Sequence, residues 1–238
     1  MHYAYILFTC LFLVPWGILF WLRKDLRFEM VWAGVIVAVF GLIAEGIWYT
    51  KDWVNPITLT NTIIGIEDAI MGFAAGGIAA VIYKDVCRQD DYKCRAHRLK
   101  THWKLSVICL LGLIVADALF RFFGIFSFYA NLIGFGLIAI ILISIREDLL
   151  KEALIGGLLL VVVSLPIYWI SFYIFPGWRE SYWKMTEISR IYFFGIPYED
   201  LVWWFFAGIN IAIAYDCYSG HCLRKLPEAS YPANRTAK

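Results

Sequence analysis

Six acidic residues of this 238-residue chain lie inside or at the edge of long apolar runs. They are Glu45, Glu67, Asp68, Asp117, Glu199 and Asp200. A charged side chain at the centre of a membrane span costs about 2.5–3.5 kcal/mol on insertion scales, so such residues usually mark a functional site. Carboxyl groups at these positions predict chemistry that moves protons, as in proton relays and general acid catalysis.

Four of the six form two adjacent pairs, Glu67 with Asp68 and Glu199 with Asp200, and each pair lies early in an apolar run. Carboxylates in a first helical turn cap free backbone N–H groups, which accounts for one residue of each pair. Adjacent residues point about 100° apart on a helix, so capping does not easily account for both. Together with Glu45 and Asp117, the pairs are predicted to converge on one layer of the membrane.

Asp117 is followed four residues later by Arg121, so the two side chains share one helix face and can neutralise each other. This pair fits either a purely structural role or support of the acidic layer.

Four large aromatic residues follow the second acidic pair: Trp203, Trp204, Phe205 and Phe206. The faces of aromatic rings attract cations by about 2 kcal/mol or more where water is excluded. Rings beside a proton donor therefore suit a reaction that passes through a carbocation. Packing against lipid accounts equally well for any one of the four.

These groups must be positioned by membrane-spanning helices. Hydrophobic residues make up 61% of the chain and charged residues only 17%, which excludes a water-soluble monomer. About 20 apolar residues in a helix cross a hydrocarbon core of about 30 Å. Seven such runs are present, at about 3–22, 31–49, 63–83, 105–123, 126–145, 153–175 and 193–215. We expect an all-α integral membrane protein with seven transmembrane helices.

Most Lys and Arg residues fall on one side of this topology, above all in the loop 84–104. The positive-inside rule therefore places the N-terminus outside and the C-terminus in the cytoplasm of an integral cell-membrane protein. The basic loop is a topology determinant on this interpretation, and contact with anionic lipids is the alternative. A net charge of only +2, without a concentrated basic face, argues against nucleic-acid binding.

The sequence also predicts an internal repeat. The spacing that relates the two acidic pairs also relates Phe73 to Phe205 and Gly76 to Gly208. Two three-helix units joined by one linking helix are parallel repeats, related by an axis along the membrane normal. The predicted parts are a first repeat (1–84), a basic loop with the linking helix (85–125), a second repeat (126–217) and a cytoplasmic tail (218–238).

Motifs for bound cofactors are missing from the sequence. No Gly-x-Gly-x-x-Gly follows a strand, no Walker lysine motif is present, and the last apolar run has no lysine for a retinal Schiff base. We expect no cofactor and no metal. The cysteines near the predicted cytoplasmic side match no standard zinc pattern, and a disulfide is not expected there.

The segment Gly195-Ile-Pro-Tyr-Glu-Asp200, followed by Leu-Val-Trp-Trp-Phe-Phe, resembles the lycopene cyclase domain family of membrane-embedded carotenoid cyclases. The family pattern is Pro-x-Glu followed by Glu or Asp, which Pro197, Glu199 and Asp200 match. In the first half, Gly65-Ile-Glu-Asp68 keeps the acidic pair but lacks the proline. The resemblance covers nearly the whole chain, in the fused two-repeat form of the family.

The resemblance implies a lycopene β-cyclase, an enzyme of intramolecular lyase or isomerase type in carotenoid biosynthesis. Protonation at C2 of the linear ψ end creates a cation at C1, the C5–C6 double bond closes the ring, and loss of the C6 proton gives a β-ionone ring. Such chemistry needs a carboxylic acid that stays protonated near neutral pH, which apolar surroundings and neighbouring carboxylates favour. It also needs a base, which an adjacent carboxylate can be.

The resemblance further implies roles for individual residues. Glu199 is the leading candidate for the acid. Three carboxylates would relay protons or stabilise the cation: Asp200, Glu67 and Asp68. Four residues would support the site: Pro197, Glu45, Asp117 and Arg121. The implied partners are lycopene or a similar apolar polyene, the lipid bilayer and other carotenoid biosynthesis enzymes.

Two other functions fit the same residues. A proton-coupled transporter also uses parallel repeats with acidic residues inside the membrane. Such a transporter needs a polar path across the membrane, but the inner halves of the spans offer little polarity beyond Ser164 and Asn210. A cyclase of another prenyl or terpenoid chain shares the fold and the acidic layer.

Overall fold

The computed structural model of the chain describes residues 2–93 and 103–225. Within these residues, seven helical segments are long and apolar enough to cross a membrane, which confirms the predicted all-α membrane fold. The segments are α1 (Ala4–Leu22), α2 (Arg27–Ala44) with its continuation to Asp52, α4 (Ile66–Val86), α5 (Trp103–Phe123), α6 (Ser127–Ile145), α7 (Leu150–Ile174) and α9 (Tyr198–Ser219).

The second span is longer than predicted because it does not end at Tyr49. A π-helical turn over Glu45–Tyr49 and the short helix α3 (Thr50–Asp52) continue it without a break. The extra residue in a π-helical turn rotates the side chains that follow, and such turns are frequent at functional sites. Glu45, Trp48 and Tyr49 are consequently all buried.

The seventh span begins later than predicted, at Tyr198 instead of about 193. Residues 192–197 form a hairpin in which β2 (Tyr192–Phe193) pairs antiparallel with β3 (Ile196–Pro197). Phe194 and Gly195 both have positive φ, 54° and 83°, as a two-residue hairpin turn of type I′ requires. The apolar character of Phe193 and Phe194 therefore reflects a hairpin tip and not the start of a helix.

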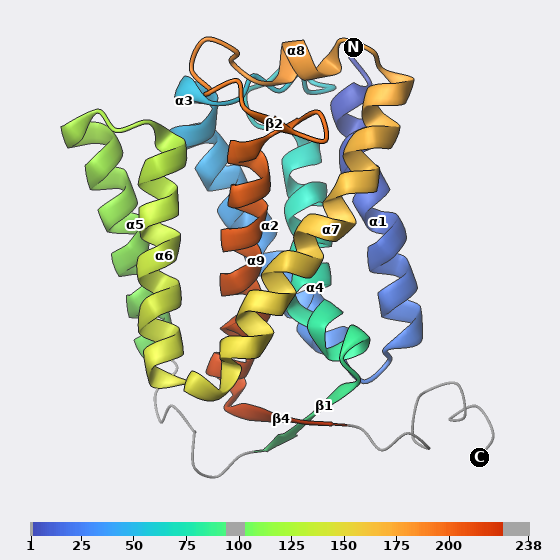
Figure 1. Ribbon diagram of the computed structural model, residues 1–238, viewed down its shortest axis with the longest axis vertical. Helices are drawn as coiled ribbons and strands as arrows, with labels where there is room; N and C mark the ends of the chain where they lie inside the picture. The colour runs from blue at the N-terminus through green and yellow to red at the C-terminus, as the bar shows by residue number, and fades with distance from the viewer. Residues whose placement is uncertain (1, 94–102, 226–238) are drawn as a thin grey trace.

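The helices pack around two central members, α4 and α9, which lie side by side and run in the same direction (Figure 1). Helix α4 contacts α1, α2, α7 and α9, and α9 contacts α6 and α7 as well. Helix α5 packs chiefly against α6, and the two form a hairpin at one edge of the bundle (Figure 1). The first turns of α4 and α9 define one end of the bundle, which we call the acid end.

The opposite end carries a two-stranded ladder, and we call it the ladder end. Strand β1 (Gln89–Lys93), which follows α4, pairs antiparallel with β4 (His221–Lys225), which follows α9. Cys222 in β4 is disulfide-bonded, so the expectation of no disulfide at this end was wrong. The parallel packing of α4 and α9 brings the segments that follow them together. The remainder of the predicted basic loop, 94–102, and of the tail, 226–238, lies outside the described residues.

Matching contacts recur in the two halves of the chain. A Cβ atom on Gly34 of α2 would lie 2.7 Å from the carbonyl oxygen of Phe73 in α4, and one on Gly157 of α7 would lie 2.7 Å from that of Phe205 in α9. Glycine is thus needed in both halves for close helix packing. The division of the chain into two repeats stays a prediction, and these paired contacts support it.

Candidate active site

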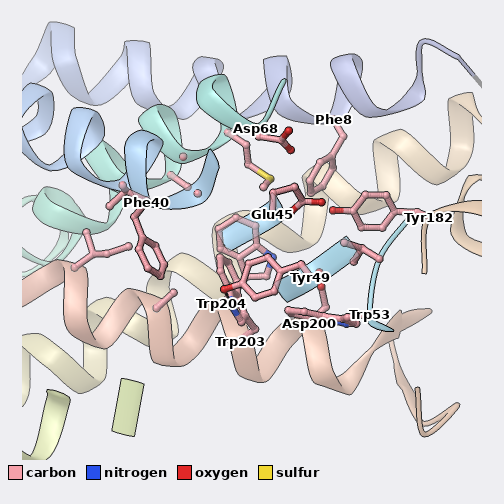
Figure 2. A pocket seen from close by; sticks show the side chains of 18 of the residues that line it. Phe8, Phe40, Glu45, Tyr49, Trp53, Asp68, Tyr182, Asp200, Trp203 and Trp204 are labelled. Atoms are coloured by element: carbon pink, nitrogen blue, oxygen red, sulfur yellow. Dashed lines mark hydrogen bonds between the residues drawn. The ribbon is translucent and has the colours of Figure 1, made fainter. Parts of the chain in front are cut away.

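A cavity with an almost wholly apolar lining opens between the helices near the acid end (Figure 2). Three carboxyl groups line it, each from a different helical segment: Glu45 from the π-helical turn, Asp68 from α4 and Asp200 from α9. Eight aromatic side chains also line it: Phe8, Phe40, Tyr49, Trp53, Tyr168, Tyr182, Trp203 and Trp204. No Lys or Arg is found among the described lining residues.

Asp68 is held by hydrogen bonds in the first turn of α4. Its Oδ2 accepts the backbone N–H of Gly65 at 2.7 Å, which is the capping contact that the sequence predicts for one member of the pair. Its Oδ1 accepts a hydrogen bond from the hydroxyl of Tyr5, which α1 supplies. The carboxyl group of Asp68 thereby both caps the helix and faces the cavity.

Asp200 is held in a comparable way in the first turn of α9. Tyr168 of α7 donates its hydroxyl to Oδ2, and the indole N–H of Trp183 donates to Oδ1 at 3.3 Å. The indole N–H of Trp204 donates in turn to the Tyr168 hydroxyl oxygen at 3.0 Å. Each aspartate at the cavity therefore accepts a hydrogen bond from a tyrosine on a neighbouring helix.

Glu45 differs from both aspartates. Its side chain is only 4% exposed, and its Oε1 has no hydrogen-bond partner among the described residues. Figure 2 shows the hydroxyl of Tyr182 directed toward the Glu45 carboxyl group. Burial, together with the neighbouring acidic groups, raises the pKa of Tyr182 well above its usual value, so this hydroxyl keeps its proton.

Glu67 and Glu199 do not line the cavity, although both are buried. Glu67 Oε1 accepts the backbone N–H of Leu59 at 2.6 Å, and Glu199 Oε1 accepts that of Ser189 at 2.7 Å. Each glutamate thus holds the loop that covers the acid end in its half. The structure separates the members of each acidic pair, because adjacent helical residues point in different directions.

The aromatic run after Asp200 is divided in the same manner. Trp203 and Trp204 line the cavity, whereas Phe205 and Phe206 do not. Trp203 donates its indole N–H to the Tyr49 hydroxyl oxygen at 2.9 Å, which fixes the ring against the π-helical turn. Pro197 takes an extended conformation just before α9, with φ −55° and ψ 137°, and joins the hairpin to the first helical turn.

Asp117 and Arg121 form the predicted pair on α5 but lie outside the cavity lining. Arg121 Nε lies 2.7 Å from Asp117 Oδ1, and both side chains are substantially exposed. The indole N–H of Trp48 also donates to Asp117, at 3.1 Å, and so ties α5 to the π-helical turn.

The phenols of Tyr5, Tyr168 and Tyr182 were missed by reasoning from the sequence. Tyr5 lies on α1, far along the chain from Tyr168 on α7 and Tyr182 just after it, and each looks like an interfacial aromatic. Only their contacts with the carboxyl groups identify them. The sequence offered one signal. A carboxyl group buried in a span needs a hydrogen-bond partner, and a tyrosine within or next to a span can supply it.

The second half of the chain matches a known protein family. Residues 126–218 match the family model described as lycopene cyclase, and the match spans α6, α7 and α9 with the acidic pair that opens α9. Neither curated proteins nor solved structures include a significant match to the chain.

Proposed function

We propose that this chain, whose residues 126–218 match the lycopene cyclase family, is a membrane-embedded carotenoid cyclase and specifically a lycopene β-cyclase. The observation that carries the proposal is the cavity at the acid end. It combines three carboxyl groups with tryptophan and tyrosine rings in a lining that is otherwise apolar. Such a site suits a hydrocarbon substrate and a cationic intermediate.

Ring closure in this proposal needs no electron transfer. A carboxylic acid adds a proton to C2 of the ψ end group, and the π electrons of the C5–C6 double bond then form the C1–C6 bond. The resulting cation at C5 loses the proton of C6 to a carboxylate, which leaves the C5–C6 double bond of a β ring. One proton is added and one is removed, so the product is an isomer of the substrate.

The cavity lining supplies each requirement of this reaction. Asp68, Asp200 and Glu45 are the acidic and basic groups within reach of a bound end group. The faces of Trp203 and Trp204 favour a cation in a site that excludes water. Exclusion of water also protects the cation from capture as an alcohol.

We assign Glu67 and Glu199 a positioning role. Each holds a loop over the acid end through a backbone N–H, and neither lines the cavity. The sequence predicts Glu199 as the leading acid. In this proposal the acid is instead one of the three carboxyl groups that line the cavity. Replacement of Glu199 distinguishes the two assignments, as described in the Discussion.

The transporter alternative lacks a polar path in this cavity. Toward the ladder end its lining consists of apolar residues such as Val37, Ala75 and Ile211. A cyclase of another prenyl chain keeps the same chemistry with a different substrate, and the experiment below separates the two.

The test is expression of the chain in cells that accumulate lycopene, followed by chromatography of the pigments. The wild-type chain should convert lycopene to β-carotene, and Asp200→Asn should lower the conversion about 100-fold or more, as expected for loss of an acid–base group. Glu147→Gln is a suitable control, because Glu147 is exposed at the ladder end. Unchanged lycopene in cells that contain the inserted, folded wild-type protein would refute a lycopene cyclase and favour another substrate.

We also propose that the N-terminus lies outside, as the positive-inside rule predicts. The disulfide at Cys222 opposes this orientation, because disulfides persist mainly in oxidising compartments and the ladder end would be cytoplasmic. Two reporters are fused to the N-terminus in separate experiments, one active only outside the cell membrane and one active only in the cytoplasm. They decide between the orientation that the basic residues favour and the one that the disulfide favours. An active external reporter supports the proposed orientation, and an active cytoplasmic reporter overturns it.

A further inference from the structure

The three carboxyl groups at the cavity differ in the hydrogen bonds that they accept. Asp68 accepts from the Gly65 N–H and from Tyr5, and Asp200 accepts from Tyr168 and Trp183. The Oε1 of Glu45 accepts none. All three groups are nearly inaccessible to solvent, so the difference cannot be compensated by bulk water.

We propose that Glu45 donates the proton that starts ring closure, while Asp68 and Asp200 are the carboxylates that receive the departing proton and set the ring type. This division of labour rests on the proposed cyclase function. Loss of the donor and loss of a base should therefore affect the amount and the type of product differently.

The surroundings of the two aspartates favour carboxylate anions. Hydrogen bonds from a phenol and from a backbone or indole N–H stabilise an anionic acceptor more than a neutral one. Both aspartates also lie in the first turn of a long helix, where the helix dipole favours negative charge. A carboxylate so held is available to accept a proton and to stabilise a nearby cation.

The surroundings of Glu45 favour a neutral carboxylic acid instead. It lies in the last turns of a continuous helical segment that begins at Arg27 and ends at Asp52, far from the free N–H groups of the first turn. No Lys or Arg stands beside it in the described lining of the cavity. An uncompensated buried anion is costly, and the group avoids this cost when it holds a proton.

A neutral Glu45 faces the same cavity as the two anionic aspartates, so one bound end group can contact a donor and a base at once. Glu45 gives its proton to C2 and becomes a carboxylate, and the C6 proton passes to an aspartate. Return of that proton to Glu45 restores the starting state. The Tyr182 hydroxyl is directed toward Glu45 and is protonated, so it presents a neutral polar group to the Glu45 carboxylate in between (Figure 2).

The base decides which ring forms, because the C5 cation can lose three different protons. Loss from C6 gives the β ring, loss from C4 the ε ring, and loss from the methyl group on C5 the γ ring. The donor has no part in this choice. Removal of the donor therefore stops the reaction, whereas removal of the base should leave a slower reaction with altered ring types.

The experiment compares Glu45→Gln, Asp68→Asn and Asp200→Asn in lycopene-accumulating cells, with ring types identified by chromatography and mass spectrometry. Glu45→Gln should lower total cyclised product about 100-fold or more, and Glu45→Asp should recover part of the loss. At least one aspartate variant should form residual product that contains ε or γ rings. Protein amount and thermal unfolding in detergent are measured for every variant, and Glu147→Gln serves as the matched glutamate control.

The outcomes separate failure of the inference from failure of the proposed function. A wild-type chain that leaves lycopene unchanged refutes the function itself. With an active wild-type chain, a Glu45→Gln variant that keeps more than about a tenth of the activity overturns the inference. The inference is also overturned if both aspartate variants are folded but neither forms any cyclised product, or if neither forms a product with ε or γ rings.

Discussion

Buried carboxyl groups occur at both ends of the bundle, but their partners differ. At the ladder end, Lys84 is fully buried and lies 2.8 Å from Glu29 Oε1 and 3.0 Å from Asp216 Oδ1. Glu152 is buried within the same electrostatic cluster. At the acid end, the described partners of Asp68 and Asp200 are hydroxyl, indole and backbone N–H groups, without a cation.

One bundle thus uses buried acids for two purposes. A carboxylate paired with a buried ammonium group is held as an anion, and exchange of its proton would leave the cation unpaired. A carboxyl group that meets only neutral donors can gain or lose a proton at lower cost. The ladder end is therefore suited to join helices, and the acid end to proton transfer.

The predicted repeat bears on this contrast. Tyr83 and Tyr215 match between the halves, and the residues that follow them are Lys84 and Asp216. These two predicted counterparts on α4 and α9 carry opposite charges, and the structure joins them in one ion pair. The predicted counterparts at the other end, Asp68 and Asp200, are both acidic.

The largest effect is expected from Lys84→Met, which leaves buried carboxylates without their cation. Removal of one partner from a buried ion pair destabilises a protein by about 3–5 kcal/mol. Thermal or denaturant unfolding in detergent measures the change, and Lys24→Met, at an exposed lysine of the same end, is the control. A Lys84→Met variant within about 1 kcal/mol of the wild type would show that the cluster contributes little to stability.

Tyr168→Phe tests the neutral donors of the acid end. A hydrogen bond to a charged group contributes about 1.5–3 kcal/mol, so loss of the hydroxyl beside Asp200 should slow cyclisation about 10- to 100-fold. Tyr173→Phe, on the same helix but 87% exposed, should keep the wild-type rate. The measured quantity is the initial rate of cyclised product per amount of protein, and equal rates for the two variants would contradict the prediction.

Glu199→Gln should have a smaller effect, because a glutamine oxygen can still accept the Ser189 N–H. The difference between a charged and a neutral acceptor is about 1 kcal/mol, which corresponds to a loss of activity within about tenfold. Limited proteolysis of the loop before α9 should show faster cleavage than in the wild type. Complete loss of cyclisation in a folded variant with an intact loop would restore Glu199 as the leading acid.

Arg121→Ala should change stability least, by about 1 kcal/mol or less. Its ion pair with Asp117 lies at the exposed edge of α5, where such pairs contribute little. Unfolding in detergent, beside Lys84→Met, compares an exposed and a buried ion pair directly. A loss of stability as large as that of Lys84→Met would mean that the exposed ion pair contributes as much to stability as the buried one.

The sequence alone determined the features that depend on neighbouring residues. Seven apolar runs predict seven spans, because length and hydropathy are local properties. The acidic pairs, the Pro-x-Glu-Asp motif at Pro197 and the resemblance of the second half to one family were equally readable in the chain. The late start of α9 was readable in part, since Gly195 is a turn residue between apolar neighbours.

Only the tertiary structure decided which member of each acidic pair meets the cavity and which donors it finds. Asp68 and Glu67 are adjacent in the chain, but one accepts from Tyr5 on another helix and the other from a loop. The π-helical turn that buries Glu45 has no signature in its composition. A side chain's protonation and role depend on the groups around it, and packing brings those groups from distant parts of the chain, so no local pattern records them.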